Sequence, residues 1–298
     1  MTVHQEQPRV RIAELESGAE VDAVFACVRK DKLISRNGAP YLSVELRDAT
    51  GRIGGRAFRD ATFLAGQFER GDVVRVAGRV EAFQGARQIN LRSIRRVEGS
   101  APDPREFLPT AYRDIGELDG FFEHLAREVY SPQLHGLMAT LLADEPLRDA
   151  LRTAPCTRDG HHAYLGGLLE HTVAVATLAQ QTCDLHRKLN SDLVIAAALL
   201  HDIGKTREFE FGAEISLTEE GRLLGHLELG AQIIRELIAR SGGLDRELEL
   251  QLLNCVLSHH GAPQGQRFAS AEALTLYRVN GLDAQVKGAL EHGLSGPR

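Results

Sequence analysis

Histidine and aspartate side chains that can act as metal ligands recur in the second half of the sequence. His201 and Asp202 stand side by side at the end of an apolar segment, where the imidazole and the carboxylate can reach one ion and the carboxylate can bridge to a second. Ligand sets that mix nitrogen and oxygen suit Mn, Fe, Zn or Ni better than Ca or Mg. Further histidines lie at or near the ends of other predicted helices; they are His171, His226, His259 and His260. The sequence therefore predicts a metal centre that is built from several helix ends.

Helical periodicity in this half of the chain predicts the elements that would position these side chains. Apolar residues recur at helical spacing after Thr110. Residues 207–216 interrupt this pattern, alternate around Gly212-Ala213 and predict a β-hairpin. An all-α bundle of this kind can bring several helix ends to one rim, where their side chains build a metal site. The main predicted helical segments are 162–186, 191–203, 226–241, 245–260 and 271–291.

The first hundred residues have the pattern of short β-strands. Apolar and β-branched residues alternate with polar ones between turn signals such as Asn37-Gly38. A short helix is predicted near residues 60–67. Five strands with a helix between the third and the fourth is the order of an all-β OB-fold barrel, whose strand faces often bind single-stranded nucleic acid. The predicted strands are 21–28, 41–46, 53–58, 72–80 and 88–91.

A change in composition marks the boundary between these two parts. Residues 99–105 contain two prolines, a glycine and a serine, and predict a linker. We therefore expect a multidomain chain with an OB-fold domain over residues 1–98, a linker over 99–110 and a helical metal-dependent domain over 111–298. Residues 1–100 carry a net charge of +4, the remainder carries −10, and eleven of the twelve histidines follow residue 100. A mildly basic part is typical of polyanion binding, and an acidic, histidine-rich part of metal or acid–base chemistry.

Composition excludes several classes of protein. With 298 residues, 43% hydrophobic and 26% charged, the chain has an ordinary globular composition and is not wholly disordered. Its longest apolar runs are far shorter than the ~20 residues of a membrane helix, and its first residues lack the pattern of a signal peptide. The four cysteines are widely scattered, as expected in a reducing compartment. We expect a cytoplasmic protein with no membrane partner.

The order of the histidine motifs resembles that of the HD superfamily of metal-dependent phosphohydrolases, in which HDIGK is the central motif. Together with an OB-type barrel before them, these motifs are similar to the YhaM-type 3′→5′ exoribonucleases, and the resemblance covers nearly the whole chain. The segments that carry it are HHAYLGGLLEHT at residues 161–172, LLHDIGK at 199–205, SHHG at 258–261 and LDA at 282–284.

The resemblance implies a centre of two divalent ions, with Mn²⁺ as the first expectation and Fe²⁺, Co²⁺, Ni²⁺ or Zn²⁺ as alternatives. Two ions a few ångströms apart can activate a water and stabilise the charge on a phosphodiester. Asp202 would bridge the two ions. The remaining ligands by resemblance are His171 and His201 for one ion, and His226, His259 and His260 for the other.

Three further residues have catalytic roles by the same resemblance. Lys205 would steady the substrate phosphate as a point charge, one helical turn beyond His201. His162, with its neighbour His161, would contact phosphate or protonate the leaving oxygen. A pair of surface histidines without a catalytic role is the alternative interpretation of these last two residues.

The chain departs from the family at one expected ligand. The family places an aspartate where this sequence has Asn280. An amide oxygen can still bind a metal ion, but the change removes one negative charge and would weaken the first site. Asp283 is the alternative donor, although three residues further along a helix it lies roughly 60° away around the axis, and a purely structural role is equally open.

Basic and aromatic residues of the barrel are candidates for holding a nucleic-acid strand by backbone charge and base stacking. For each one alone, a solvated charge or a barrel-core aromatic ring is the alternative interpretation. The basic candidates are Arg29, Lys30, Lys32, Arg36, Arg52, Arg56, Arg59 and Arg87, and the aromatic candidates are Tyr41, Phe58 and Phe83.

Our first hypothesis is a metal-dependent 3′→5′ exonuclease that degrades single-stranded RNA, with single-stranded DNA as a further substrate and homo-oligomer formation left open. The first alternative is an HD phosphohydrolase of small or cyclic nucleotides. The segment after His260 lacks a Gly-Tyr-Pro sequence, which argues against the cyclic di-GMP type. The second alternative is a nucleic-acid-binding protein in which Asn280 has weakened or abolished catalysis.

Overall fold

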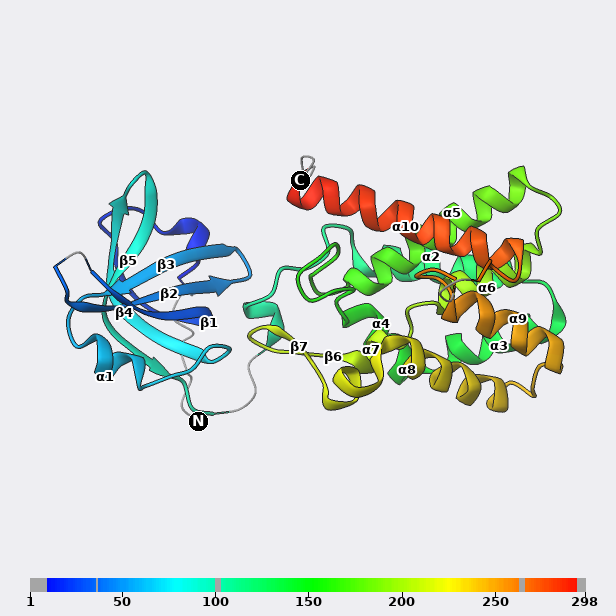
Figure 1. Cartoon of the computed structure of the whole chain (residues 1–298), viewed down its shortest axis with the longest axis horizontal. Helices are drawn as coiled ribbons and strands as arrows, with labels where there is room; N and C mark the ends of the chain where they lie inside the picture. The colour runs from blue at the N-terminus through cyan, green and yellow to red at the C-terminus, as the bar shows by residue number, and fades with distance from the viewer. Residues whose placement is uncertain (1–9, 36, 100–102, 263–265, 294–298) are drawn as a thin grey trace, which may run out of the picture. The chain divides into compact units, whose positions relative to one another are not determined.

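The computed structural model describes residues 10–35, 37–99, 103–262 and 266–293 (Figure 1). Contacts between residues divide the chain into two compact units. The first unit runs to Pro109 and includes Phe211–Ile215, and the second contains Thr110–Glu210 and the residues from Ser216 onward. Every residue that the sequence predicts as a metal ligand belongs to the second unit, so the proposed metal centre depends on that unit alone.

The first unit is a closed five-stranded barrel with strand order β1-β2-β3-β5-β4. All neighbouring strands are antiparallel except β3 and β5, and the short helix α1 (Ala61–Ala65) lies between β3 and β4 in the chain. This arrangement confirms the predicted OB-fold. The strands are β1 (Glu20–Ile34), β2 (Pro40–Asp48), β3 (Gly51–Ala57), β4 (Val73–Phe83) and β5 (Ala86–Arg96).

Alternation along β2 shows how the barrel is filled. Leu42, Val44 and Leu46 are buried in the barrel core, whereas Tyr41 and Ser43 point to the other face. Because successive side chains of a strand point to opposite faces, this pattern leaves polar and aromatic residues on the outer surface of the barrel. The outer face is therefore available for contacts with a ligand.

The second unit is helical. A small hairpin of β6 (Phe209–Phe211) and β7 (Ile215–Leu217) interrupts the succession of helices, and its tip, Phe211–Ile215, is the segment that is grouped with the first unit. The predicted bundle and hairpin are both confirmed. No helix in the described ranges is long and apolar enough to cross a membrane. The helices are α2 (Ile115–Arg127), α3 (Pro132–Ala143), α4 (Glu145–Thr153), α5 (Gly167–Leu185), α6 (Ser191–Leu200), α7 (Lys205–Glu208), α8 (Glu219–Arg240), α9 (Arg246–Leu257) and α10 (Ala271–His292).

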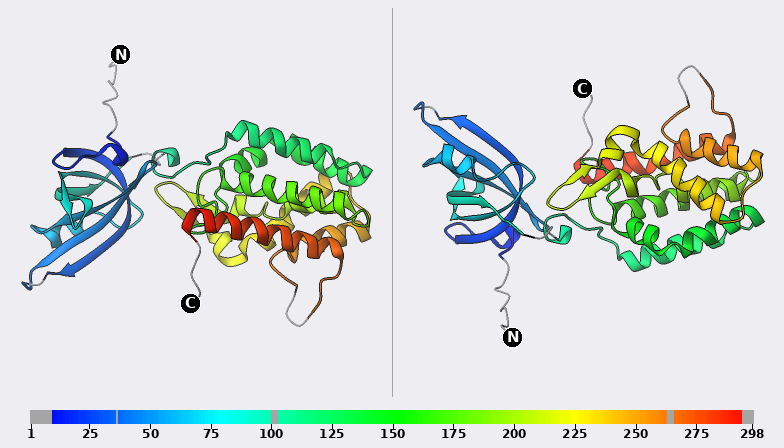
Figure 2. Two further views of the ribbon diagram at one scale, coloured as in Figure 1. Left: turned by 90° about the horizontal axis from the view of Figure 1, so that it is seen from above. Right: turned by 90° about the horizontal axis from the view of Figure 1, so that it is seen from below.

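Helix α6 forms the centre of this unit. Residues 193–200 are all buried, as expected for a helix that is apolar on every side. It packs against α5, α9 and α10, and α10 also runs alongside α5 (Figures 1 and 2). The residues that follow α6, His201 and Asp202, therefore emerge inside the unit and not on its surface.

Four helices differ by three residues or more from a predicted end, and each difference places a histidine outside or at the end of a helix. α5 begins at Gly167 instead of residue 162, because His162 and Gly166 have positive φ angles of 52° and 78° that no helix continues through. α6 ends at Leu200 instead of residue 203, so that His201 follows it. α8 begins at Glu219, but Gly225, with φ of 71°, breaks it directly before His226. α9 ends at Leu257, so that His259 lies beyond it.

Gly204 permits a close approach of backbones that helps to place His226. Its own φ of −62° suits any residue, but a Cβ atom there would lie 2.0 Å from the carbonyl oxygen of His226 and 2.5 Å from the nitrogen of Gly230. Both atoms belong to the backbone of α8 and cannot turn aside as a flexible side chain would. The absence of a side chain at residue 204 therefore allows α8 to pack against the segment that carries Asp202.

We expect Gly204→Ala to lower the free energy of unfolding by about 2–3 kcal/mol, because α8 must move to make room for the methyl group. Urea unfolding of the metal-free protein measures this change. Gly230→Ala is the matched control, since its Cβ would lie 3.4 Å from the nearest atom, which is an ordinary contact. Equal stability of the two variants would contradict the assignment of tight packing to Gly204.

Candidate metal centre

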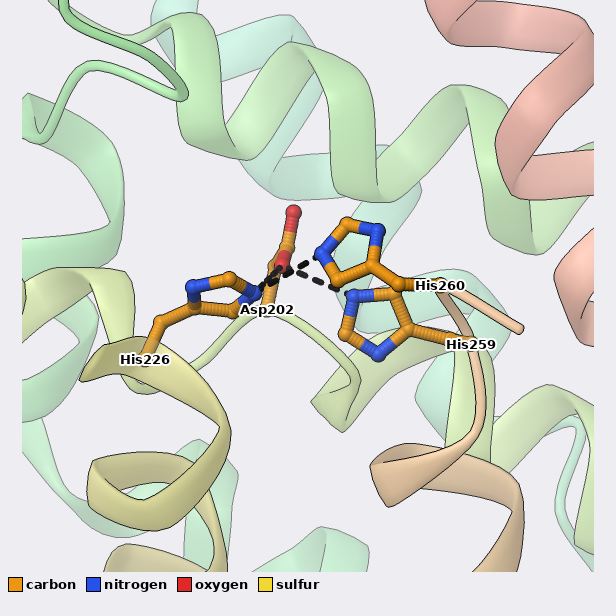
Figure 3. Close-up of side chains that lie close together, drawn as sticks. All are labelled: Asp202, His226, His259 and His260. Carbon is orange, nitrogen blue, oxygen red and sulfur yellow. Dashed lines mark hydrogen bonds and ion pairs between the residues drawn. The ribbon is translucent and has the colours of Figure 1, made fainter. Parts of the chain in front are cut away.

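Asp202 lies between two groups of histidines, one facing each of its carboxylate oxygens. Its carboxyl group is 2% exposed, and Figure 3 shows the imidazoles of His226, His259 and His260 gathered around one oxygen. The Oδ2 atom faces His171 and His201, and the Oδ1 atom faces His226 and His259. A single carboxylate with ligand nitrogens on both sides has the arrangement of a bridging ligand.

The first donor set consists of His171, His201, Asp202 and Asn280. The Nε2 atoms of His171 and His201 are 3.3 Å apart and lie 3.5 and 3.4 Å from Oδ2 of Asp202. Oδ1 of Asn280 lies 3.0 Å from Nε2 of His171. The three side chains that the sequence predicted for the first ion thus lie together, with Asn280 beside them.

Outer hydrogen bonds orient both imidazoles of the first donor set. Nδ1 of His201 is 2.7 Å from the carbonyl oxygen of Ala198, and Nδ1 of His171 is 2.6 Å from Oδ2 of Asp283. Carbonyl and carboxylate oxygens accept hydrogen bonds, so each Nδ1 carries the proton and each Nε2 presents a lone pair to the centre. Asp283 therefore lies behind His171, as an orienting partner, and Asn280 occupies the position of the ligand.

The second donor set consists of Asp202, His226, His259 and His260. Nε2 of His226 is 2.9 Å from Nε2 of His260, and Nε2 of His259 is 3.4 Å from Oδ1 of Asp202. Nδ1 of His259 donates to the carbonyl oxygen of Val256, and Nδ1 of His226 donates to Glu208 at 3.2 Å. Lone pairs of several imidazoles thus converge on one volume, which favours a cation between them.

Two buried atoms in this second set lack partners. Oδ1 of Asp202 and Nε2 of His259 face each other at 3.4 Å, and neither makes a hydrogen bond among the described residues. A buried polar atom left unpaired costs about 1–3 kcal/mol, and more where the group is charged. A divalent ion would satisfy both atoms at once, so the residues fit the metal centre that the sequence predicted.

Electrostatics keep Asp202 ionised. Burial alone would raise the pKa of its carboxyl group, but the adjacent ammonium group of Lys205 is the strongest of the opposing influences, and the pKa is held well below its usual range. Nζ of Lys205 is 2.7 Å from Oδ2 of Asp202, and burial lowers the pKa of Lys205 less than the carboxylate raises it. Lys205, which the sequence predicted as a phosphate contact, thus binds Asp202 directly. It also lines a pocket above the two donor sets.

A pocket of about 600 Å³ opens over both donor sets. Its lining includes metal-ligand candidates from both sets together with Lys205, Arg158 and Tyr277. The volume is in the range of pockets that hold a ligand of nucleotide size. The centre is therefore accessible to a ligand in the pocket although its carboxylate is buried.

The two adjacent histidines of the HHAY segment have different surroundings. His161 lines the pocket, and burial lowers its pKa to about 4. His162 is 1% exposed, and its ring contacts Asp283 through Nε2 at 3.1 Å and Tyr164 through Nδ1 at 2.9 Å. Burial would lower the pKa of His162, but the carboxylates of Asp283 and Glu170 raise it. The geometry gives no support to the prediction that His162 contacts phosphate, because both ring nitrogens are held by the protein, away from the pocket.

Sequence reasoning missed two residues of this centre. Glu208 holds His226 in place by accepting hydrogen bonds from its backbone N–H and its Nδ1. Cys156 lines the pocket with its sulfur 3.9 Å from Oδ2 of Asp202. A glutamate inside a predicted hairpin and an isolated cysteine carry no spacing signal, so neither stands out in the sequence.

On the barrel, the predicted aromatic residues lie on the outside. Tyr41 and Phe58 stack with their ring centroids 5.4 Å apart, and 55% of Phe58 is exposed. The guanidinium of Arg56 lies 4.7 Å from the ring centroid of Phe83, which is also exposed. These residues form an outer aromatic surface next to a cation, which suits stacking of unpaired bases.

The predicted basic residues of the barrel have varied surroundings. Lys30 is held by the backbone oxygen of Phe68 and by Glu69. Arg29 pairs with Asp31, Arg52 pairs with Glu45, and Arg87 donates to the backbone of Leu15. Lys32 and Arg59 are exposed, and Arg36 lies outside the described residues. Arg29, Arg52 and Arg87 also line one groove on the barrel.

We expect Asn280→Asp to tighten binding of the first ion roughly tenfold or more, because it adds a negative charge within 3.0 Å of His171 Nε2. Titration calorimetry of the metal-free protein with Mn²⁺ measures this. Gln285→Glu is the control, since it adds the same charge at an exposed position of the same helix. If both variants bind Mn²⁺ as the unchanged protein does, Asn280 does not face a metal.

Comparison with known proteins gives matches for both units and for the chain as a whole. The sequence model of the HD domain matches residues 168–287, and that of an OB-fold nucleic acid binding domain matches residues 24–97. The chain is 30% identical over 283 residues to the 3′–5′ exoribonuclease YhaM of Bacillus velezensis, with 91% of this chain and 87% of the relative covered. The protein of the same name from Bacillus subtilis is 29% identical over 279 residues, with the same shares covered.

The HD match spans the ligands of both donor sets, and the OB-fold match spans most of the barrel. The order of the two matched domains is the one that the sequence motifs predicted, and the similarity to the curated relatives extends through both of them. The chain belongs to the family of YhaM-type 3′–5′ exoribonucleases, hydrolases in which an OB-fold domain precedes an HD domain.

Proposed function

We propose that this protein removes nucleotides from the 3′ end of single-stranded RNA, with two divalent ions held by the two donor sets. The observation that carries the proposal is the orientation of Asp202, whose two oxygens face separate groups of imidazoles. The relatives from Bacillus velezensis and Bacillus subtilis are named 3′–5′ exoribonucleases, which supports the direction and the substrate class. Single-stranded DNA is a second substrate to be tested, since stacking and backbone charge do not require a 2′-hydroxyl group.

The residues around the pocket would have separate roles in hydrolysis. Ions held on both sides of Asp202 would supply an activated water and neutralise charge on the phosphodiester. Lys205 holds the Asp202 carboxylate by its hydrogen bond of 2.7 Å and keeps it ionised. Asp283 and Glu208 fix the rings of His171 and His226, so that the donor atoms are oriented before substrate arrives.

The donor chemistry favours particular metals. Imidazole nitrogens outnumber carboxylate oxygens in both donor sets, and such sets suit Mn²⁺, Fe²⁺, Co²⁺, Ni²⁺ or Zn²⁺ better than Mg²⁺. The neutral Asn280 leaves Asp202 as the only negative charge shared by the two sets. We therefore expect the first ion to be held more weakly than the second.

The barrel would supply a grip that does not depend on base sequence. Tyr41 and Phe58 offer stacking surfaces, because every base has an aromatic face. Arg56 provides a cation beside Phe83 and would contact the backbone of the strand. Binding of an RNA strand would account for the presence of this domain. Hydrolysis of a small nucleotide would leave the domain without a role.

We predict that the protein with Mn²⁺ shortens a 5′-labelled RNA oligomer from its 3′ end. Asp202→Asn should reduce the rate of shortening at least ~1,000-fold, because the change removes a ligand of both ions. Gel electrophoresis of the labelled RNA follows the reaction. Asp184→Asn, which removes the same charge from an exposed position on α5, is the control.

Activity that persists in Asp202→Asn would overturn the two-ion mechanism. A protein inert on RNA and on DNA with every one of these metals would instead support a role in binding alone. Faster turnover of mononucleotides or cyclic dinucleotides than of the oligomer would favour a small-molecule phosphohydrolase. Each outcome is read from the same reaction with a different substrate or metal.

We predict that Phe58→Ala weakens binding of single-stranded RNA roughly tenfold, since one base–aromatic stack contributes about 1–3 kcal/mol. Fluorescence anisotropy with a labelled oligomer and Asp202→Asn protein, which leaves the RNA intact, measures the affinity. Phe63→Ala is the matched control, because Phe63 is a 67% exposed aromatic residue of the same barrel on α1, apart from the stacked pair. Equal losses in both variants would remove the assigned role of the Tyr41–Phe58 surface.

A further inference from the structure

A third group of metal-ligating side chains lies in the same pocket as the two donor sets. Cys156, His161 and His171 each offer a ligand atom, and these atoms all lie within 4.8 Å of one another. All three residues line the pocket. Cys156 and His161 belong to neither donor set, and the proposed hydrolysis gives the thiol of Cys156 no role.

The loop between α4 and α5 holds the sulfur and the second imidazole in place. The backbone N–H of Cys156 donates to the carbonyl oxygen of His162 at 3.1 Å, which closes the loop around His161. The side chain of Cys156 is fully buried, with its sulfur 3.5 Å from Nζ of Lys205. The sulfur is therefore fixed inside the pocket and faces polar groups, not an apolar core.

His161 is free to act as a ligand. Its ring packs against the rings of His162 and His171, with centroids 5.8 and 5.4 Å away. Neither of its ring nitrogens makes a hydrogen bond within the part of the chain that the structure describes. In this it differs from His162, whose two ring nitrogens are both held.

The third group shares His171 with the first donor set. Nδ1 of His171 is held by Asp283 at 2.6 Å, which leaves Nε2 as its one free ligand atom. An ion bound through Cys156 and His161 would therefore take the nitrogen that faces His201 and Asn280. An ion on the first donor set and an ion on the third group would therefore compete for Nε2 of His171.

We propose that Cys156, His161 and His171 bind a thiophilic divalent cation of the Zn²⁺ class, in competition with the first donor set. One thiolate and two imidazoles form a donor set that Zn²⁺ and Co²⁺ prefer and that Mn²⁺ and Mg²⁺ do not. The thiol proton passes to solvent when the metal–sulfur bond forms. Because the ion at the third group withdraws His171, excess Zn²⁺ inhibits an enzyme that Mn²⁺ activates. Only this inhibitory consequence rests on the proposed function.

Titration of the metal-free protein with Co²⁺ tests the site without any assay of activity. A thiolate bound to Co²⁺ gives a charge-transfer absorption in the near ultraviolet, which ligation by nitrogen and oxygen alone does not give. We expect this band in the unchanged protein and in Cys183→Ala, and its loss in Cys156→Ala. Cys183 is the matched control because it is also a buried free cysteine of the helical unit and does not line the pocket.

His161→Gln is a second variant that keeps the thiol and changes a residue that is only partly buried. We expect it to weaken Co²⁺ binding measured by the same band roughly tenfold, on the order of one lost ligand. The absence of the band in the unchanged protein, or its persistence in Cys156→Ala, would overturn the proposal. Circular dichroism spectra of each variant confirm that the fold is retained.

A second measurement tests the competition. The Zn²⁺ concentration that halves the Mn²⁺-supported rate, taken relative to each variant's own rate without Zn²⁺, should rise about tenfold in Cys156→Ala and stay constant in Cys183→Ala. Equal inhibition of both variants would show that Zn²⁺ acts elsewhere. If the protein degrades no RNA at all, the proposed function fails, whereas the cobalt spectra still decide whether the third group binds metal.

Discussion

The buried negative charge of Asp202 is the interaction on which the rest of the helical unit depends. A carboxylate that is 2% exposed is costly unless cations and hydrogen-bond donors surround it. Lys205 satisfies one oxygen, and the histidines that face both oxygens come from α5, the end of α6, α8 and the segment after α9. Four parts of the chain must therefore converge on one carboxyl group. This convergence requires a central helix that is buried on every side. It also requires close packing directly after that helix, where residue 204 has no room for a side chain.

The imidazoles around this charge are oriented by partners outside the centre. Backbone carbonyl groups of the preceding helical turn hold His201 and His259, while the carboxylates of Asp283 and Glu208 hold His171 and His226. In every case the outer partner accepts the proton of Nδ1, so that Nε2 presents its lone pair inward. Because the rings are already oriented, the centre needs little rearrangement to accept an ion. Holding several unpaired nitrogen lone pairs close together costs free energy, and a bound ion offsets that cost.

Sequence alone was sufficient for the order of the domains, because strand-like alternation changes to helical periodicity near residue 110. It also singled out the histidines that lie together around Asp202, because their motifs follow in a distinctive order. It was not sufficient to separate His161 from His162. The residues after them continue a helical pattern, and the sequence does not show that His162 has a positive φ angle. In the structure His161 lines the pocket, whereas the ring of His162 lies inside the protein. Nor does a count of basic residues reveal which ones are paired. Arg29 and Arg52 each have an acidic partner on the folded barrel, although nothing in their spacing indicates it.

The donor sets change how the net negative charge of the helical unit is expected to affect RNA binding. Residues 101–298 carry a net charge of −10, which by itself opposes an RNA strand. In the two donor sets, however, the histidines are neutral ligands, and Asn280 removes the second carboxylate that the family pattern would supply. Two divalent ions with Asp202 as the one carboxylate among their ligands would leave a positive centre at the base of the pocket, although Asp283 and Glu208 lie behind His171 and His226. On the proposed two-ion centre, Asn280 in place of the family's aspartate would weaken binding of the first ion and at the same time strengthen the attraction of the loaded centre for a phosphodiester. Affinity for metal and affinity for substrate would then oppose each other at residue 280.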